Sequence, residues 1–446
     1  MSLRLCKTLT FLILIGITVE KSRAQVHSLS IQDAIALATK NNAAVKNAIL
    51  NLHLQEQDNK SVTAGALPTV SGSAGTTIFF QTPVTIVPGE FFGYPPGTTL
   101  AVSFQPKYVA TAGFTLDQTI FDGQVFVGLK ARKTALDFYK SQLNTTIESI
   151  TVNVYKIYYQ LVVSRTQMTL IDSNIARADK LLHDTKIMYA NGFMEKLDMD
   201  KATVQLANLQ TLKTTTQTTI DNGYLSLKFL IGLPSADSVV LTSSFREEDL
   251  TRSFFLDSGY RYENRPDYQT MQLSRQLDDF DVRRYKALYY PTLSLNGAFQ
   301  KNAYNNTYDF FSKGGNWYST SYAGISLHVP IFSGFSKDAN LQKARLRREQ
   351  TDVAMENLRQ SIDLEVGQAR NTFLNAIHTI SYQKENVALA ESVYNQTKKK
   401  FESGLASNTD LNDSQTSLIE AQTNYVNALY LAVIAKIDYL KAIGKI

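Results

Sequence analysis

The sequence is poor in cysteine and tryptophan, and it has no long hydrophobic run after its first residues. Its 446 residues include one Cys, one Trp, 10 Pro and 22 Gly. A single thiol excludes disulfide cross-links within the chain and cysteine metal centres. No later segment is apolar over the roughly 20 residues that a membrane-spanning helix needs. With 44% hydrophobic and 19% charged residues, the chain is not disordered or collagen-like.

Signals for nucleic-acid binding and for catalysis are also missing. The net charge of +5 is scattered, with no basic stripe and interleaved aromatics, so no nucleic-acid partner is expected. Ser381 and Lys384 match a Ser-x-x-Lys pattern of penicillin-recognising enzymes, but they lie inside a predicted long helix without partner motifs. We find no phosphate-binding loop or nucleophile elbow. The histidines show no second ligand at metal spacing; they are His27, His53, His183, His328 and His378. We therefore predict no enzyme, no metal and no cofactor.

Residues 1–24 have the three parts of a secretory signal peptide. Arg4 and Lys7 form the positive region, 8–19 is the apolar core, and Ser22-Arg23-Ala24 supplies the small residues that a signal peptidase reads. A membrane anchor is the alternative, but the apolar core is too short to span a bilayer. The only cysteine precedes this core, so we expect no lipid anchor and a mature chain without a thiol.

Two similar stretches, 112–123 and 323–334, organise the rest of the chain. In each, apolar residues alternate with small or polar ones, which indicates a β-strand with one apolar face. Each strand leads to a glycine, Gly123 or Gly334, and a very long helical pattern follows. The repetition predicts an internal duplication.

Both long helical patterns are interrupted at a glycine and then resume. The first runs from 124 to about 191, where Asn191-Gly192-Phe193 breaks it, and a continuous helix of that length would measure about 100 Å. Its seam recurs at four- and three-residue spacing, at Ile150, Val154, Ile157 and Leu161. The second runs from about 337 to 402 and breaks at Ser403-Gly404-Leu405. Each copy therefore predicts a long helical hairpin.

The same element order precedes each hairpin. In the first copy, a helix from Ser30 to about Lys60 leads to Leu67-Pro68 and a strand. A proline- and glycine-rich loop at 81–106 follows, in which we expect no regular element. In the second copy, Asn264-Arg265-Pro266-Asp267 opens a helix, and Tyr290-Pro291 precedes a strand. We predict a first repeat at 25–232, a linker at 233–259 and a second repeat at 260–446.

Four strands in one chain are too few to close a barrel. An open sheet in lipid would leave unpaired backbone at its edges, so several chains must share one barrel if the strands lie in a membrane. Aromatic residues near the strand ends favour this arrangement over a soluble sheet packed on helices. They are Phe79, Phe80, Phe121, Tyr290, Tyr322 and Phe332.

Over essentially its whole mature length the chain resembles the TolC-type outer-membrane efflux proteins. The resemblance rests on the duplicated element order, the proline-led strands, Asn264-Arg265-Pro266-Asp267, and the turns at 120–123 and 331–334. It implies a mainly α-helical fold whose duplicated hairpins form a periplasmic α-barrel. It also implies a homotrimer with a twelve-stranded β-barrel among outer-membrane lipids. An inner-membrane pump and a periplasmic adaptor would be the partners.

The resemblance also suggests sites. The tips Asn191-Gly192-Phe193 and Ser403-Gly404-Leu405 match turns that meet the adaptor, and Gly123 and Gly334 become the points where barrel passes into tunnel. Three acidic residues follow the tips and could form carboxylate rings at a periplasmic gate; they are Asp198, Asp410 and Asp413. The simpler alternatives are glycines that only end helices and aspartates that only favour helix starts.

The chain departs from the family pattern beside the second tip. Ala406 stands where that pattern has Arg, and the preceding aromatic, Phe401, has no hydroxyl, so a gate closed by an Arg–Tyr hydrogen-bond network is not expected. The lysine run at 398–400 is typical of a solvated helix face. The sequence thus favours a passive exit duct for efflux or type I secretion. An exported coiled-coil structural protein and a stand-alone porin are the alternatives.

Overall fold

The computed structural model describes residues 26–243, 259–311 and 316–446, and the predicted signal peptide lies outside them. The chain divides into two compact units, each built from three separate stretches. Of the described residues, one unit contains those in 26–42, 150–243 and 374–437, and the other contains those in 43–149, 259–373 and 438–446. No helix in the described ranges has both the length and the apolar character that crossing a membrane requires.

The first unit is a group of helices around a short parallel sheet. Its sheet pairs β1 (Val26–Leu29) with β6 (Ser238–Leu241), and α1 (Ile31–Asn41) follows β1 directly. The two hairpins consist of α3 (Gly123–Ala190) with α4 (Lys196–Ile231), and of α7 (Ser336–Glu402) with α8 (Asn408–Ala442). Only the parts of α3, α7 and α8 at 150–190, 374–402 and 408–437 belong to this unit.

Tyr158 of α3 joins the helices of this unit to its sheet. Its side chain is fully buried, and its hydroxyl donates to the Leu29 carbonyl at 2.9 Å and accepts from the Ser243 amide at 3.1 Å. Ile150, Val154, Ile157 and Leu161 all lie in or against the same core, which confirms the predicted seam. On α4, Gly223 packs closely against this core, since a Cβ would lie 2.7 Å from Leu161 Cδ2 and the leucine side chain would have to shift.

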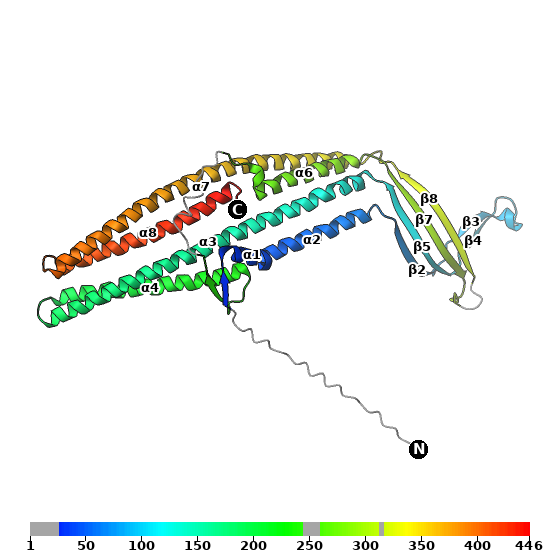
Figure 1. Ribbon diagram of the computed structural model, residues 1–446. Helices are drawn as coiled ribbons and strands as arrows, with labels where there is room; N and C mark the ends of the chain where they lie inside the picture. The colour runs from blue at the N-terminus through cyan, green and yellow to red at the C-terminus, as the bar shows by residue number, and fades with distance from the viewer. Residues whose placement is uncertain (1–25, 244–258, 312–315) are drawn as a thin grey trace, which may run out of the picture. The chain divides into compact units, whose positions relative to one another are not determined.

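The second unit combines helices with an antiparallel four-stranded sheet. Its helices are α2 (Ala43–Ala64), the start of α3, α6 (Pro266–Ala287) after the short helix η2 (Tyr262–Asn264), and the first part of α7. The strand order is β2 (Thr69–Ile78), β5 (Tyr108–Phe121), β7 (Thr292–Asn305) and β8 (Trp317–His328), as Figure 1 shows. β2 and β8 are therefore the two edges of this sheet.

Alternation gives this sheet two chemically different faces. We call one the apolar face. On it, Gly72, Phe114 and Phe299 lie side by side on neighbouring strands, as do Leu295 and Ile325. The other, the polar face, carries Ser, Thr and Asn in the intervening positions. Large side chains of the apolar face are open to the surroundings: Val70, Phe114, Phe299, Ile325 and Leu327 are between 47% and 69% exposed. The predicted alternation of the four strands is confirmed.

Two expectations about smaller elements were wrong. The helix predicted from Ser30 to about Lys60 is two helices, since Asn42 takes an extended ψ of 135° and donates its side-chain amide to the Leu230 carbonyl. The loop at 81–106 contains a hairpin, β3 (Thr85–Pro88) with β4 (Thr99–Val102), and the short helix η1 (Gly89–Phe92). Pro88 is tolerated because β3 is an edge strand of a two-stranded sheet. The strand β6, within the predicted linker at 233–259, was not anticipated, because four residues are too few to show periodicity.

Candidate functional site

The two hairpin tips share one backbone geometry. Gly192 and Gly404 have φ of +78° and +75°, the left-handed region that favours glycine. After each glycine, the next amide reaches back to the carbonyl five residues earlier, Phe193 to Met188 at 2.9 Å and Leu405 to Lys400 at 2.8 Å. This is the Schellman end of a helix. The expected helix-ending role of both glycines is therefore met, whatever further role the tips have.

Each tip presents one large apolar side chain to the surroundings. Phe193 is 82% exposed and Leu405 is 79% exposed, and both directly follow the glycine. The two tips lie near each other in the same unit, because Lys201 Nζ donates to Thr409 Oγ1 at 3.2 Å just beyond them. In a Schellman motif the residue after the glycine usually packs against the last turn of the helix. Here both of these side chains remain largely exposed.

The acidic residues after the tips differ in their local roles. Asp410 closes a capping box, since its carboxylate accepts from the Ser407 amide at 2.9 Å and from the Ser407 hydroxyl at 2.7 Å. These bonds lower the pKa of the exposed Asp410. Asp413 is exposed one turn later, whereas Asp198 is half-buried in the first turn of α4, whose N-cap residue makes no side-chain capping bond. The helix-start alternative therefore describes Asp410 well.

The start of α8 also buries amides that make no hydrogen bonds. Asn408 and Gln415 are 5% and 1% exposed, and no described residue pairs with their side-chain amides or with that of Asn412. Leaving such a group unsatisfied costs about 1–3 kcal/mol. Phe401, the aromatic before the second tip, packs beside the cluster of Leu181, Tyr394, Leu411 and Leu418. Sequence reasoning placed gate residues here but missed the buried amides.

The two predicted barrel-to-tunnel turns are not equivalent. Gly334 has φ +60° and is followed by Phe335 at +64°, so the chain passes from β8 to α7 through two left-handed residues. Gly123 instead begins α3. A Cβ added to it would lie 2.9 Å from Ala287 Cβ, so glycine is favoured here because the backbone passes close to the end of α6. The side chain of Asp122 caps α3 by accepting from the Gln124 amide at 2.8 Å.

A charged cluster in the second unit surrounds Arg265 of the Asn264–Asp267 motif. Its guanidinium is 6% exposed and donates to Asp267 and Glu365, each at 2.7 Å, and to the Ala442 carbonyl at 3.2 Å. Hydrogen bonds to the two carboxylates outweigh burial and hold its pKa above the usual value. The cluster fastens the end of α8 to the entry of α6, which is a structural role that the sequence motif alone did not reveal.

Other predicted features lie apart from these sites. Lys398 pairs with Glu402 at 3.9 Å along an exposed surface of α7, as a solvated helix face would. His27 contacts Asp237 at 3.3 Å. Within the described ranges, no group of three or more His, Cys, Asp or Glu residues could hold a metal ion.

Comparisons with known proteins identify the family to which this architecture belongs. The outer membrane efflux protein family matches residues 34–233 and 262–445. The outer membrane protein TolC of Vibrio cholerae is 20% identical over 75% of this chain and 76% of its own. The proteases secretion protein PrtF of Dickeya chrysanthemi is 19% identical over 90% of this chain and 84% of its own.

A solved structure supports the same fold. The Campylobacter jejuni CmeC outer membrane channel matches 93% of this chain and 85% of its own, with a TM-score of 0.75 at 17% identity. The matched segments span both hairpins and the four strands of the sheet. The chain therefore belongs to the outer membrane efflux protein family, the outer-membrane exit channels of bacterial efflux and secretion systems.

Proposed function

We propose that the chain works as a homotrimer in which three four-stranded sheets close one twelve-stranded barrel above a helical tunnel. The observation that carries this is the sheet, since β2 and β8 each leave one edge unpaired while one face is apolar and exposed. In lipid, unpaired backbone groups each cost several kcal/mol, so the edges must be satisfied by other copies. Pairing β2 of one copy with β8 of the next does this.

The absence of thiols beyond Cys6 allows a direct test. We would place Cys at Ser71, on the polar face of β2, and singly at Thr320, Tyr322 or Ser326, on the polar face of β8. If the edges pair, one combination forms a disulfide between copies upon oxidation in the outer membrane, and covalent trimers result. Ser71→Cys with Ser321→Cys is the matched control, because Ser321 faces the apolar side. Failure of every same-face pair would contradict the shared barrel.

We further propose that the tips receive a periplasmic adaptor and that an inner-membrane transporter supplies the energy. The support is the exposed Phe193 and Leu405 together with the names of the relatives, which include a protease secretion protein and the antibiotic efflux pump component ArpC of Pseudomonas putida. Exposed apolar side chains at the end of a hairpin provide anchors that a partner can bury.

A gate at the acidic residues completes the proposal. In a trimer, Asp198, Asp410 and Asp413 would each occur three times around the axis, and carboxylate rings attract cations and repel one another. Asp413 is the better candidate among the two on α8, since Asp410 already serves the helix cap. The same proposal includes two repeats, at 25–232 and 260–446, joined by the segment 233–259. It also includes a barrel-to-tunnel role for Gly123 and Gly334. Catalysis has no part in it.

A further inference from the structure

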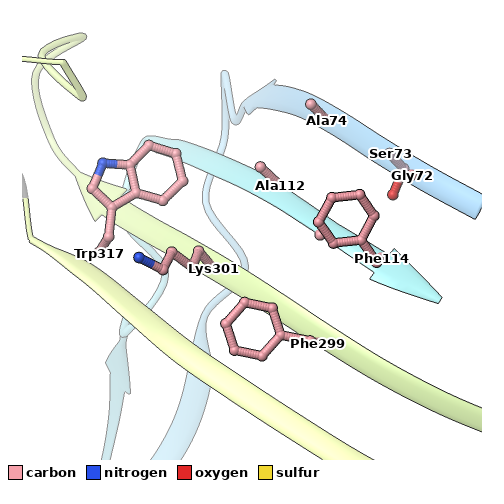
Figure 2. Close-up of a pocket in the computed structure, with 9 residues that line it drawn as sticks. Gly72, Ser73, Ala74, Ala112, Phe114, Phe299, Lys301 and Trp317 are labelled. Carbon is pink, nitrogen blue, oxygen red and sulfur yellow. The ribbon is translucent and has the colours of Figure 1, made fainter.

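A hollow of about 710 Å³ lies on the four-stranded sheet, mainly on its apolar face (Figure 2). All four strands contribute to it. Its lining consists of small residues, aromatic rings and one lysine: Gly72, Ser73, Ala74, Ala112, Gly113, Phe114, Phe299, Lys301 and Trp317.

Small residues form the floor of the hollow and aromatic rings form its walls. Gly72, Ala74 and Ala112 have little or no side chain to fill the space above β2 and β5. The Phe114 ring lies over Gly72, and a Cβ added to Gly72 would be 3.3 Å from Phe114 Cε1. Phe299, from β7, is 47% exposed. A shallow apolar trough between rings suits a flexible hydrocarbon chain, which fills it by dispersion contacts and loses little on leaving surrounding lipid.

Lys301 is the single charged residue of the apolar face as the register defines it. It is exposed, and no described carboxylate lies within ion-pair distance. Figure 2 shows its side chain extending toward Trp317. An unpaired ammonium on a lipid-facing surface is costly unless it reaches a headgroup.

The position of Lys301 along β7 brings a headgroup within reach. β7 starts at Thr292, just after α6, and Lys301 lies nine residues further, about 30 Å along the strand. The part of the hollow that contains Lys301 and Trp317 therefore lies toward the end of the sheet remote from the helices, and the part that contains Gly72 and Phe114 lies near the middle of the strands. If the sheet spans the outer membrane as proposed, the remote end meets the headgroups of the outer leaflet. Trp317, at the start of β8, is the residue type that prefers this interface.

We propose that this hollow is a binding site for a phosphate-bearing anionic lipid. One acyl chain crosses Gly72 and Ala112 between the rings of Phe114 and Phe299, and a phosphate oxygen accepts a hydrogen bond from Lys301 Nζ. Charge complementarity selects this occupant, since the face carries one cation and no anion. The inference rests on the proposed function, because it requires the apolar face to meet lipid.

The test uses the full-length protein extracted from outer membranes in mild detergent and stripped of lipid. Binding of phosphatidylglycerol, of phosphatidylcholine with the same chains, and of inorganic phosphate is measured by native mass spectrometry. Phosphatidylglycerol should bind more tightly than phosphatidylcholine. Lys301→Gln should weaken phosphatidylglycerol binding about fivefold, the factor for about 1 kcal/mol per lysine at a membrane surface. Ala112→Leu, which fills the floor, should weaken both lipids.

Two controls match these variants. Lys107→Gln removes a lysine near the same sheet end whose Nζ lies over the Tyr108 ring, and Ala323→Leu enlarges the apolar face outside the hollow. Both should bind lipid as the wild type does. Equal binding by Lys301→Gln and wild type would overturn the proposal, as would inorganic phosphate that competes as well as the lipid. Failure of export by the wild-type protein would instead count against the proposed function, so the two failures are distinguishable.

Discussion

Asp410 has one role that the structure shows, in the cap of α8, and one that is proposed, in a periplasmic gate. Its carboxylate binds both the amide and the hydroxyl of Ser407, so it stabilises the start of α8 whether or not it also faces a pore. The spacing of Asp410 and Asp413 was readable from sequence as one helical face. The capping box was also encoded, because Ser407 and Asp410 have the Ser-x-x-Asp spacing of one, but we did not predict it from the sequence.

Charge and capping at this position can be separated by substitution. Asp410→Asn and Asp413→Asn should each lower the cation-to-anion permeability ratio of single channels in planar bilayers, because each removes a ring of carboxylates. Ser407→Ala is the matched control, since it weakens the cap by about 1 kcal/mol and keeps the charge. If the permeability ratio stays constant in both Asn variants, or falls equally in Ser407→Ala, the carboxylates are not part of the gate.

Glu148 of α3 offers a second test at the residue scale. It is 9% exposed, and burial, followed by repulsion from Asp267, raises its pKa; Arg265 and Lys441 oppose the shift, and Glu365 adds to it. A raised pKa means that the protonated form favours the folded state. This contribution is fully present below the unfolded pKa near 4.5 and is lost as pH rises through the folded value.

Glu148→Gln keeps the neutral form at every pH. The melting temperature of the variant, followed by circular dichroism in detergent, should match that of the wild type near pH 4 and exceed it increasingly toward pH 7. Glu365→Gln is the contrasting variant, because hydrogen bonds and attraction from Arg265 and Lys441 lower the pKa of Glu365 despite burial. It should lose stability relative to wild type as pH rises from about 4. A difference between Glu148→Gln and wild type that does not change with pH would contradict the role of Glu148.

At the scale of elements, long and strongly periodic segments were predictable. The hairpin helices and the four strands of the sheet follow spacing that a core or a lipid face imposes over many residues, and their bounds fall within a few positions of expectation. β1, β3, β4 and β6 have four residues each, too few for a period. β1 and β6 pair only through tertiary structure, and no local pattern encodes that. For the same reason, the hollow around Lys301 could be recognised only once the register of the strands was known.

The same substitution should act oppositely at two glycines of the second hairpin. Gly404→Ala forces a Cβ into the left-handed region at φ +75° and should cost about 1–2 kcal/mol. Gly367 lies inside α7, is exposed, and has no neighbouring atom within 4 Å of where a Cβ would stand, so Gly367→Ala should stabilise by about 0.5–1 kcal/mol. Thermal unfolding of the two variants measures both. Equal shifts of the same sign would show that the tip does not require its left-handed turn.

At the scale of the whole molecule, export tests whether the tips recruit a partner. Phe193→Asp and Leu405→Asp each replace an exposed apolar anchor by a charge, and we expect roughly tenfold or greater weakening of cross-linking to the adaptor and a matching loss of export. Lys399→Asp is the control, a charge change one turn before the second tip. Outer-membrane assembly should be normal in all three. Full export in both tip variants would exclude the tips as the docking site.

The pairing of β1 with β6 has a consequence for the order of folding. Val26 lies beside Ser238, so the first strand finds its partner only after the entire first sheet pair and hairpin have been synthesised and exported. Closing a loop of this length costs entropy before any contact repays it, and such distant pairings form slowly. Tyr158, which bonds both Leu29 and Ser243, can close the cluster only at that stage. Until then the amino-terminal strand is an unpaired edge in the periplasm, open to chaperones and proteases.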